Sequence, residues 1–193
     1  FLGAIRTFLL ISSIILSISA ASAQSPDGPE SITVYLTEEQ ALKKAFPDAD
    51  TLWSDIWTPT QQERRRIERR LGWRLEETEF TIFQAQKENN HLGYTIITNQ
   101  IGLYKPITFM VHIKLDGRVG GVWIMVYRES RGGQIKRQRF LSQYKNKKTD
   151  SHIRLNRDIV GISGATLSVR ALNAGVKKIL TIIDVAHSPK ESP

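Results

Sequence analysis

The chain has 193 residues, of which 40% are hydrophobic, and its formal net charge at pH 7 is +8. It contains no cysteine, which excludes a disulfide framework, a CxxC zinc site and a CxxCH haem attachment. The length predicts one domain after any leader is removed. The positive charge favours nucleic acid, anionic lipid or an acidic protein as partner without choosing among them.

The first 23 residues have the pattern of a signal peptide. Arg6 precedes an apolar run from Phe8 to Ser19, and Ala21-Ser22-Ala23 matches a small-residue cleavage site. The apolar run is short for a membrane span, and a retained membrane anchor is the alternative. We therefore expect export to a periplasm-like compartment, with a mature chain that begins at Gln24 and is soluble or membrane-associated.

The mature chain is predicted to begin with a linker and a short helix. Residues 24–31 contain two prolines and a glycine, which are typical of a linker, and residues 32–193 are predicted to form the single domain. Thr37 and Gln40 form a capping box, so we expect a helix that stops before Pro47.

A second helix is predicted from the capping box Thr58-Pro59-Thr60-Gln61 to Gly72. Its arginines can form a patch for nucleic acid or an acidic partner, or a solvated face partly compensated by Glu63 and Glu68; we favour the solvated face. The residues concerned are Arg64, Arg65, Arg66, Arg69 and Arg70.

Three tryptophans flank this helix. They do not alternate with the arginines on a strand, as a base-stacking platform would require, so they are interpreted as core or interface residues and no nucleic acid is expected. They are Trp53, Trp57 and Trp73.

The middle of the chain is rich in β-branched and aromatic residues. These predict four strands, at Phe80–Gln86, Leu92–Thr98, Ile107–Leu115 and Val119–Tyr127. Asn89-Asn90 and Asp116-Gly117 predict turns, and Gly120-Gly121 predicts a bulge or a close backbone approach. We expect an α+β fold, with an antiparallel meander of about four strands packed against N-terminal helices and a C-terminal helix.

The segment from Tyr127 to Lys148 holds eight basic residues and one acid. Gly132-Gly133 predicts a loop, and Arg137–Tyr144 a short helix. The segment is either a solvated basic loop or a cradle for an anion. Tyr127 either contacts a ligand or belongs to the core at the end of its strand.

Residues Asp158–Asp184 are the stretch that organises the chain. An extended approach from Ile159 to Ser163 turns at Gly164 into an amphipathic helix, with Ser163 as the expected N-cap. The predicted buried stripe is Leu167, Ala171, Ala174, Val176, Leu180 and Ile183, and Asn173, Lys177 and Lys178 are expected on the polar faces.

This helix start is a candidate anion site. Helix N-termini present unpaired N–H groups and partial positive charge. Gly161 and Gly164 allow a ligand to approach the backbone closely, and Thr166 places a hydroxyl in the first turn.

The turn Ser163-Gly164-Ala165-Thr166 resembles the SGAT signature of the FMN-binding domain family, which includes the C subunit of sodium-pumping NADH:quinone reductases and the G subunit of Rnf complexes. The basic segment and Ala41–Pro47 also resemble small exported members, so the resemblance covers most of the mature chain. The matching residues are Tyr127, Arg128, Glu129, Arg131, Gly132, Gly133, Phe140, Leu141, Gln143, Tyr144, Lys145, Arg157, Asp158 and Ile159.

The resemblance implies FMN attached through its phosphate to Thr166 by a separate flavin transferase, with a membrane reductase or quinone-linked complex as redox partner. The cofactor-binding residues it implies are Thr166, Ser163, Gly164, Ala165, Ile162, Gly161, Tyr127, Glu129, Arg131 and Lys145. The family usually has an acidic residue six positions before the threonine, and this chain departs from that pattern with Val160.

The residue chemistry agrees with an acceptor role. A threonine hydroxyl is a weak nucleophile that needs a base or metal from outside, the nearest histidine in sequence is His152, and the four histidines show no metal-ligand spacing. Cationic side chains at Arg128, Arg131 or Lys145 would favour a negatively charged reduced flavin.

Three hypotheses follow. The first is an exported flavoprotein that carries electrons and is not a stand-alone enzyme. The second is a non-redox module that reversibly binds a phosphate-bearing or polyanionic ligand. The third is a reductase of free FMN, which would need a nicotinamide site, and the sequence has no GxGxxG motif.

Overall fold

The structure is a computed structural model that describes residues 32–187. The predicted signal peptide and linker, together with residues 188–193, lie outside the described residues. Within residues 32–187, no helix combines the length and apolar character needed to cross a membrane.

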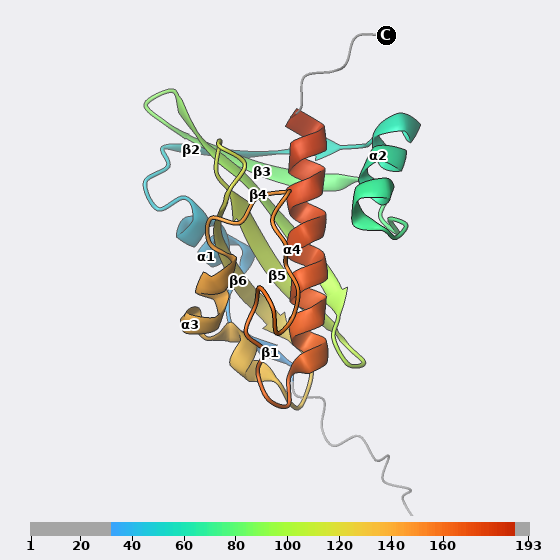
Figure 1. Cartoon of the computed structure of the whole chain (residues 1–193). Coiled ribbons are helices and arrows are strands. Elements are labelled where there is room, and N and C mark those ends of the chain that lie inside the picture. The colour runs from blue at the N-terminus through green and yellow to red at the C-terminus, as the bar shows by residue number, and fades with distance from the viewer. Residues whose placement is uncertain (1–31, 188–193) are drawn as a thin grey trace, which may run out of the picture.

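A six-stranded antiparallel sheet forms the centre of the fold (Figure 1), in the order β1-β6-β5-β4-β3-β2. The four predicted strands are confirmed within a few residues, and the α+β class is confirmed. The strands are β1 (Thr33–Val34), β2 (Thr51–Trp57), β3 (Phe80–Lys87), β4 (Asn90–Ile101), β5 (Pro106–Ile113) and β6 (Val119–Tyr127).

The sequence analysis missed the two edge strands. β1 has only two residues, and β2 leaves every residue except Trp53 and Trp57 exposed. Neither strand therefore has the buried alternating face on which strand prediction depends. Each is defined by its ladder to a neighbour, β6 for β1 and β3 for β2.

The turns of the meander lie close to their predicted places. The β3–β4 turn is at Glu88-Asn89, one residue earlier than predicted, and both residues have positive φ (48° and 66°). Gly117 also has positive φ in the β5–β6 turn. The predicted bulge is confirmed, because His112 pairs with Gly121 and Ile113 with Val119, which leaves Gly120 as the extra residue of β6.

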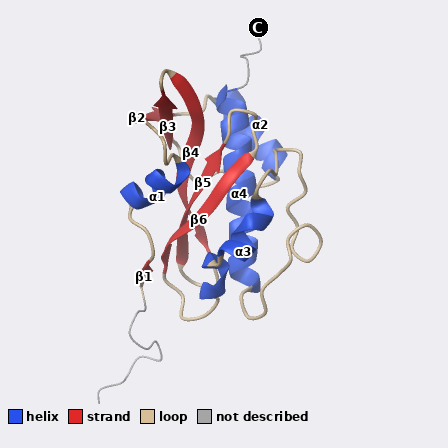
Figure 2. Cartoon of the chain, turned by 90° about the vertical axis from the view of Figure 1, so that its left-hand side faces the viewer, coloured by secondary structure: helices blue, strands red, loops and turns tan. Residues whose placement is uncertain are grey.

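Helices cover both faces of the sheet (Figure 2). One face carries α1 (Glu38–Ala45), which packs on a small apolar cluster that includes Met110 and Met125. The other face carries the main core and the remaining helical elements, among which α4 runs along the sheet. These are α2 (Gln61–Leu71), the 3-10 turns η1 (Gly133–Lys136) and η2 (Ser142–Tyr144), α3 (Gln138–Leu141) and α4 (Thr166–His187).

The capping box of α1 is confirmed, but that of α2 was predicted two residues too early. The Thr60 hydroxyl accepts the Glu63 N–H (3.3 Å), and the Glu63 carboxylate accepts the Thr60 N–H (2.7 Å). An ionised carboxylate is a stronger acceptor than the Gln61 amide that the prediction required. The helix ends at Gly72 in a left-handed conformation, as predicted.

The buried face of α4 differs from the predicted stripe. Leu167 is exposed, whereas Asn173 and Lys178 are buried. The Asn173 Oδ1 accepts a hydrogen bond from the Tyr144 hydroxyl (2.6 Å), and the Lys178 ammonium pairs with the Glu77 carboxylate. Apolar periodicity alone does not reveal these polar contacts, because their partners lie far away in sequence.

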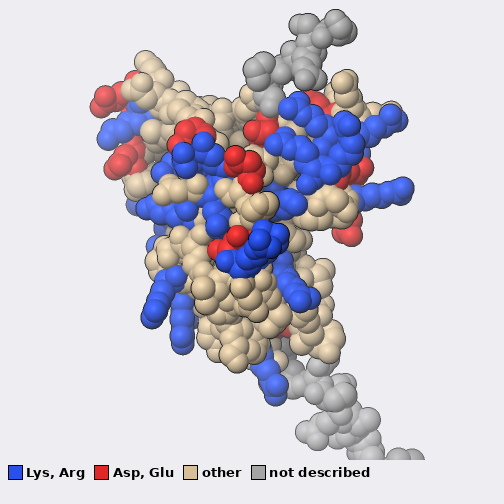
Figure 3. All heavy atoms as spheres, viewed as in Figure 1, with Lys and Arg blue, Asp and Glu red and all other residues tan. Residues whose placement is uncertain are grey.

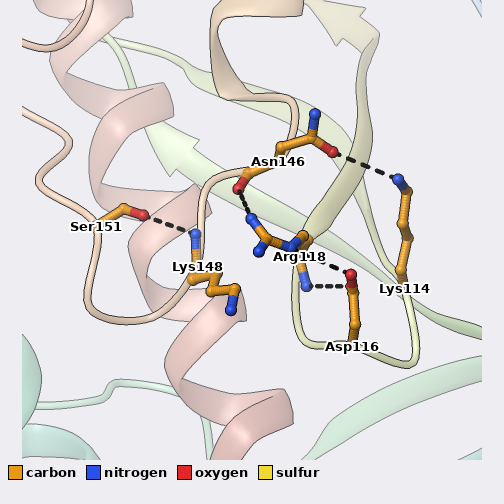
Figure 4. A network of polar contacts seen from close by, with 6 residues as sticks. All are labelled: Lys114, Asp116, Arg118, Asn146, Lys148 and Ser151. Carbon is orange, nitrogen blue, oxygen red and sulfur yellow. Dashed lines mark hydrogen bonds and ion pairs between the residues drawn. The ribbon is translucent and has the colours of Figure 1, made fainter.

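The basic segment is fixed to the β5–β6 hairpin at its end (Figure 4). Lys114 Nζ and Arg118 Nη1 donate to the side-chain and backbone oxygens of Asn146 (3.4 Å each), and Arg118 also pairs with Asp116 (3.2 Å). The chain then turns back, with the Lys148 N–H bonded to the Ser151 hydroxyl (2.8 Å). These contacts hold the chain that leads to α4 against the sheet.

Candidate functional site

The turn before α4 exposes Thr166 at the first position of a 22-residue helix. Gly164 has φ of 75°, which reverses the chain, and the Ala165 N–H donates to the Ile162 carbonyl (3.0 Å). The Ala165 carbonyl then accepts the first bond of the helix from Val169 (2.9 Å). Ala165 therefore occupies the N-cap position.

The prediction that Ser163 caps the helix is wrong. Ser163 lies two residues before the cap, exposed in the turn, because the Gly164 reversal postpones the helix start. Ala165 has no side-chain acceptor, and within residues 32–187 the N–H groups of Thr166, Leu167 and Ser168 have no hydrogen-bond partner. The helix therefore presents three free donors at an exposed end.

The glycine loop of the basic segment packs directly on this turn. Gly132 has φ of 86°, and a Cβ there would lie 2.6 Å from the Tyr127 hydroxyl, 3.1 Å from Ser168 Oγ and 3.3 Å from Ala165 Cβ. Only glycine allows this approach. Residues 132 and 165, which are far apart in sequence, thus form one close-packed unit.

Tyr127 supports the turn from beneath. Its ring is buried, its hydroxyl donates to the Arg131 carbonyl, and the hydroxyl lies 3.0 Å from Ser168 Oγ. Burial raises the pKa of Tyr127, so the hydroxyl stays protonated at neutral pH. The Tyr127 hydroxyl thus has hydrogen-bond partners inside the protein. Of the two positions expected for Tyr127, beside a ligand or in the core, the structure shows the core position.

A pocket of about 560 Å³ opens beside Thr166. We call it the Thr166 pocket. Leu103, Tyr104 and Leu167 give it an apolar side, and all three are exposed. Its full lining is Leu103, Tyr104, Glu129, Ser130, Arg131, Gly164, Ala165, Thr166, Leu167 and Ser168.

A second pocket, of about 520 Å³, lies on the other side of Arg131 and Gly164. We call it the basic pocket, because its ionisable lining includes Arg131, Lys136 and Arg137 and no acid. Its remaining lining is Tyr35, Ser130, Gly132, Gly133, Gln134, Ser163 and Gly164. The two pockets share an exposed arginine, a combination that suits an anionic ligand with an apolar part.

Glu129 organises the rim of the Thr166 pocket. One carboxylate oxygen, Oε1, accepts the backbone N–H groups of Leu103 (2.6 Å), Tyr104 (2.9 Å) and Lys105 (3.1 Å). Gly102 makes room for it, because a Cβ there would lie 2.7 Å from Oε1. Tyr104, although 79% exposed, is therefore held on a fixed loop.

The other predicted residues lie outside both pockets. Gly161 and Ile162 belong to the approach, where a Cβ on Gly161 would lie 2.8 Å from Asn156 Oδ1, and Ile162 packs on the main core. Lys145 is exposed after η2 and lines neither pocket. Arg128 donates to the Pro106 carbonyl (2.9 Å) and to the hydroxyl of Thr108 (2.8 Å), so it is tied to β5.

Val160, which stands where the resemblance led us to expect an acid, is fixed by its backbone. Its N–H donates to Gln143 Oε1 (2.7 Å), and its carbonyl accepts from Gln143 Nε2 (3.4 Å). Its side chain is 73% exposed. Residue 160 thus faces solvent near the threonine turn and contributes nothing to the core.

Sequence reasoning missed several residues of the site. Leu103 and Tyr104 lie in the loop after β4, where exposed apolar residues carry no periodic signal. Tyr35 lines the basic pocket and directly follows β1, a strand that was not predicted. Ser168 was hidden within the helix pattern. The doublet Gly102-Leu103 after a strand was the one available signal for a close backbone approach.

Comparison with known proteins agrees with this arrangement. Residues 102–181, from the Glu129-bound loop through most of α4, match the model of the FMN-binding domain. No curated protein matches the chain.

Two similar solved structures are those of NqrC from Shewanella oneidensis and of the C subunit of the Na⁺-translocating NADH-quinone reductase from Parabacteroides distasonis. They have TM-scores of 0.51 each and sequence identities of 12% and 14%. The matches cover 76% and 80% of this chain, and 88% and 86% of theirs. The likeness shows a shared fold, and the family match supports FMN as the ligand. Over residues 102–181, the chain is thus similar to the FMN-binding domain family.

Proposed function

We propose that this protein is an electron-carrying flavoprotein in which FMN is esterified through its phosphate to Thr166. The observation that carries the proposal is the exposed Thr166 hydroxyl, at the rim of a pocket and at the free N-terminus of α4, within an FMN-binding domain. A phosphodiester at this position would lie beside three free N–H groups and the positive end of the helix.

The residues that line the Thr166 pocket are chemically suited to FMN. The Thr166 pocket has a volume in the range of small-ligand sites, and its apolar side can receive an aromatic ring system. We propose that the side chains of Leu103 and Tyr104 contact the flavin ring system. Arg131, which lines both pockets, would supply the positive charge. Gly161, Ile162, Ser163, Gly164 and Ala165 shape the turn, Tyr127 and Glu129 support it, and Lys145 contributes charge from outside the pockets.

Attachment requires a separate transferase. Forming the phosphoester joins Thr166 Oγ1 to the flavin phosphorus, transfers the hydroxyl proton to a base and releases the leaving group of the flavin donor. Glu129 is the only acid lining the Thr166 pocket, its Oε1 is occupied by three N–H groups, and no histidine lines the pocket. The described part of the chain therefore offers no evident base.

Bound FMN would supply one- and two-electron redox chemistry, and the protein would tune it by charge and hydrogen bonding. Arg131 is exposed between the pockets and would favour the anionic reduced ring, which raises the reduction potential. The firm loop at Leu103 and Tyr104 would restrict water at one edge of the ring.

We further propose that residues 32–193 act as one exported, periplasmic domain that exchanges electrons with a membrane reductase or quinone-linked complex. The signal-peptide pattern of residues 1–23 supports export. The names of the similar structures, which point to a sodium-translocating NADH-quinone reductase, support that redox setting.

Co-expression with an exported flavin transferase tests the proposal. After denaturing electrophoresis, wild-type protein is expected to carry flavin fluorescence, and Thr166→Ala none, whereas the matched variant Ser163→Ala keeps it. A yellow native protein whose fluorescence is lost on denaturation would instead indicate reversible FMN binding. A colourless native protein would contradict the proposed function.

A further inference from the structure

A second surface, distant from Thr166, is built from the arginines of α2 and the segment that follows it. Figure 3 shows lysine and arginine side chains gathered over α2. The arginines of this region are Arg64, Arg65, Arg66, Arg69, Arg70 and Arg74. Their contacts divide them into two groups.

Two of the arginines hold the fold together. Arg64 donates to the carbonyls of Leu75 (3.0 Å) and Glu77, which fixes the segment after the helix. Arg70 pairs with Asp184 of α4 at 2.6 Å. These two charges are used inside the protein.

Three acids of the region also have partners inside the protein. Glu63 caps α2, Glu68 accepts the Leu75 N–H (3.0 Å) and lies 3.7 Å from Arg64, and Glu77 pairs with Lys178. Within residues 32–187, no carboxylate therefore pairs with the remaining arginines, which are Arg65, Arg66, Arg69 and Arg74.

Three of these arginines line a concave surface of about 1070 Å³ around a tryptophan. We call it the Arg-Trp pocket, formed by Arg65, Arg69, Trp73 and Arg74. Trp73 is 41% exposed, and the Lys177 ammonium lies 5.7 Å from its ring centroid, which adds a further positive charge. Of its lining residues, only Glu68 is acidic, and it is bonded as above.

Acidic residues begin next to the Arg-Trp pocket. A neighbouring pocket of about 680 Å³ shares Trp73 and Arg74 with it, and its other ionisable lining residues are Glu76, Glu77, Glu79 and Lys178. A solvated helix face needs neither a concave shape nor an exposed tryptophan at its centre, whereas arginine and tryptophan are the residues enriched at the energetic centres of protein interfaces.

We propose that the Arg-Trp pocket is the docking site for an acidic segment of a partner protein. Arginine forks bind carboxylates with two parallel hydrogen bonds. The concave form fits a protruding polypeptide better than it fits a flat bilayer. For three of the arginines, the proposal takes up the acidic-partner patch that the sequence analysis weighed against a solvated face.

The pocket leaves the flavin site accessible. Lys177 follows Thr166 by eleven residues, so it lies about 16 Å further along the axis of α4, and its ammonium is 5.7 Å from the Trp73 ring centroid. A partner docked here would not cover Thr166. The proposal does not depend on the proposed function, because it concerns a different surface.

Binding of a fluorescent acidic peptide, oligoglutamate, to the flavin-free protein at low salt tests the proposal. The triple charge reversal R65E/R69E/R74E is expected to weaken binding at least about tenfold. The matched control K43E/K44E/K87E makes the same charge change on exposed lysines elsewhere and should weaken binding by less than about threefold. Trp73→Ala, which keeps the charge, should weaken it several-fold.

Two further probes identify the partner class. Vesicles of phosphatidylglycerol and a duplex DNA are expected to bind more weakly than the peptide and to be affected equally by both triple variants. Equal loss of peptide binding in both triple variants would overturn the proposal, as would tighter, pocket-dependent binding of vesicles or DNA. If R65E/R69E/R74E lowers the melting temperature, R65Q/R69Q/R74Q serves instead, with about half the effect on the logarithm of Kd expected.

Discussion

The first turn of α4 and its middle differ in whether their polar groups have partners within the protein. At the start, Thr166 is exposed, and the N–H groups of Thr166, Leu167 and Ser168 have no partner in the described chain. Further along the helix, Lys178 is only 3% exposed and is paired with Glu77. The same helix therefore carries free groups where a ligand is proposed and satisfied groups where the fold is held. A polar residue indicates function here when its partners are missing.

The largest expected effect is the difference in unfolding free energy between alanine substitutions at two glycines of the site, one closely packed and one in open space. Gly132→Ala places a methyl group 2.6 Å from the Tyr127 hydroxyl at φ of 86° and is expected to cost about 3 kcal/mol of unfolding free energy. Gly164→Ala, at φ of 75° with open space around it, should cost only about 1 kcal/mol. Urea unfolding measures the loss of unfolding free energy in each variant. Equal losses would show that the close packing around Gly132 does not contribute to stability.

Histidines offer the same contrast between buried and exposed groups. Burial beneath α1 lowers the pKa of His112 from 6.5 to about 4. The unfolded chain then binds more protons between these values, so stability should fall by up to about 3 kcal/mol as the pH drops from about 6.5 to 4, and level off below.

Unfolding in urea at several pH values checks this prediction. His112→Gln should flatten the slope between pH 6.5 and 4, whereas His152→Gln, at an exposed position, should leave it unchanged. An unchanged slope in the His112 variant would assign the pH dependence to other groups.

The loop that Glu129 holds should loosen when its acceptor is removed. Glu129→Ala deletes three hydrogen bonds to the loop after β4 and should cost about 2 kcal/mol. Hydrogen exchange at Leu103, Tyr104 and Lys105 should rise together. Glu129→Gln keeps an acceptor oxygen and should show a smaller change; protection that survives in the alanine variant would refute the anchoring role.

Residue 160 should affect attachment without affecting stability. Its side chain faces solvent, so Val160→Asp should change the unfolding free energy by less than about 0.5 kcal/mol. If an acid there assists the transferase, flavin incorporation at limiting transferase should rise several-fold. A variant with unchanged incorporation would show that the valine is tolerated.

Local signals predicted most of the fold. Alternating apolar residues gave the four central strands, and capping boxes gave both early helices, although the choice between Thr58 and Thr60 depended on an ion–dipole contact with Glu63. The edge strand β2 was missed because it has almost no buried face.

The site was predicted only where it is contiguous. The turn around Thr166 could be predicted from one stretch of sequence. The contact of Gly132 with Ala165 depends on tertiary packing, and so does the position of Leu103 and Tyr104 in the lining of the Thr166 pocket. Ser163 was misassigned because a left-handed Gly164 delays the helix start, which residue preferences do not report.

The central claim is that Thr166 carries FMN, and intact mass of the secreted protein tests it most directly. Produced with an exported flavin transferase, wild-type protein should gain the mass of one FMN less one water. Thr166→Ala should gain none, while its unfolding free energy changes by less than about 0.5 kcal/mol because the side chain is exposed. A wild-type mass without the increment, or an increment that persists in the folded alanine variant, would contradict the claim.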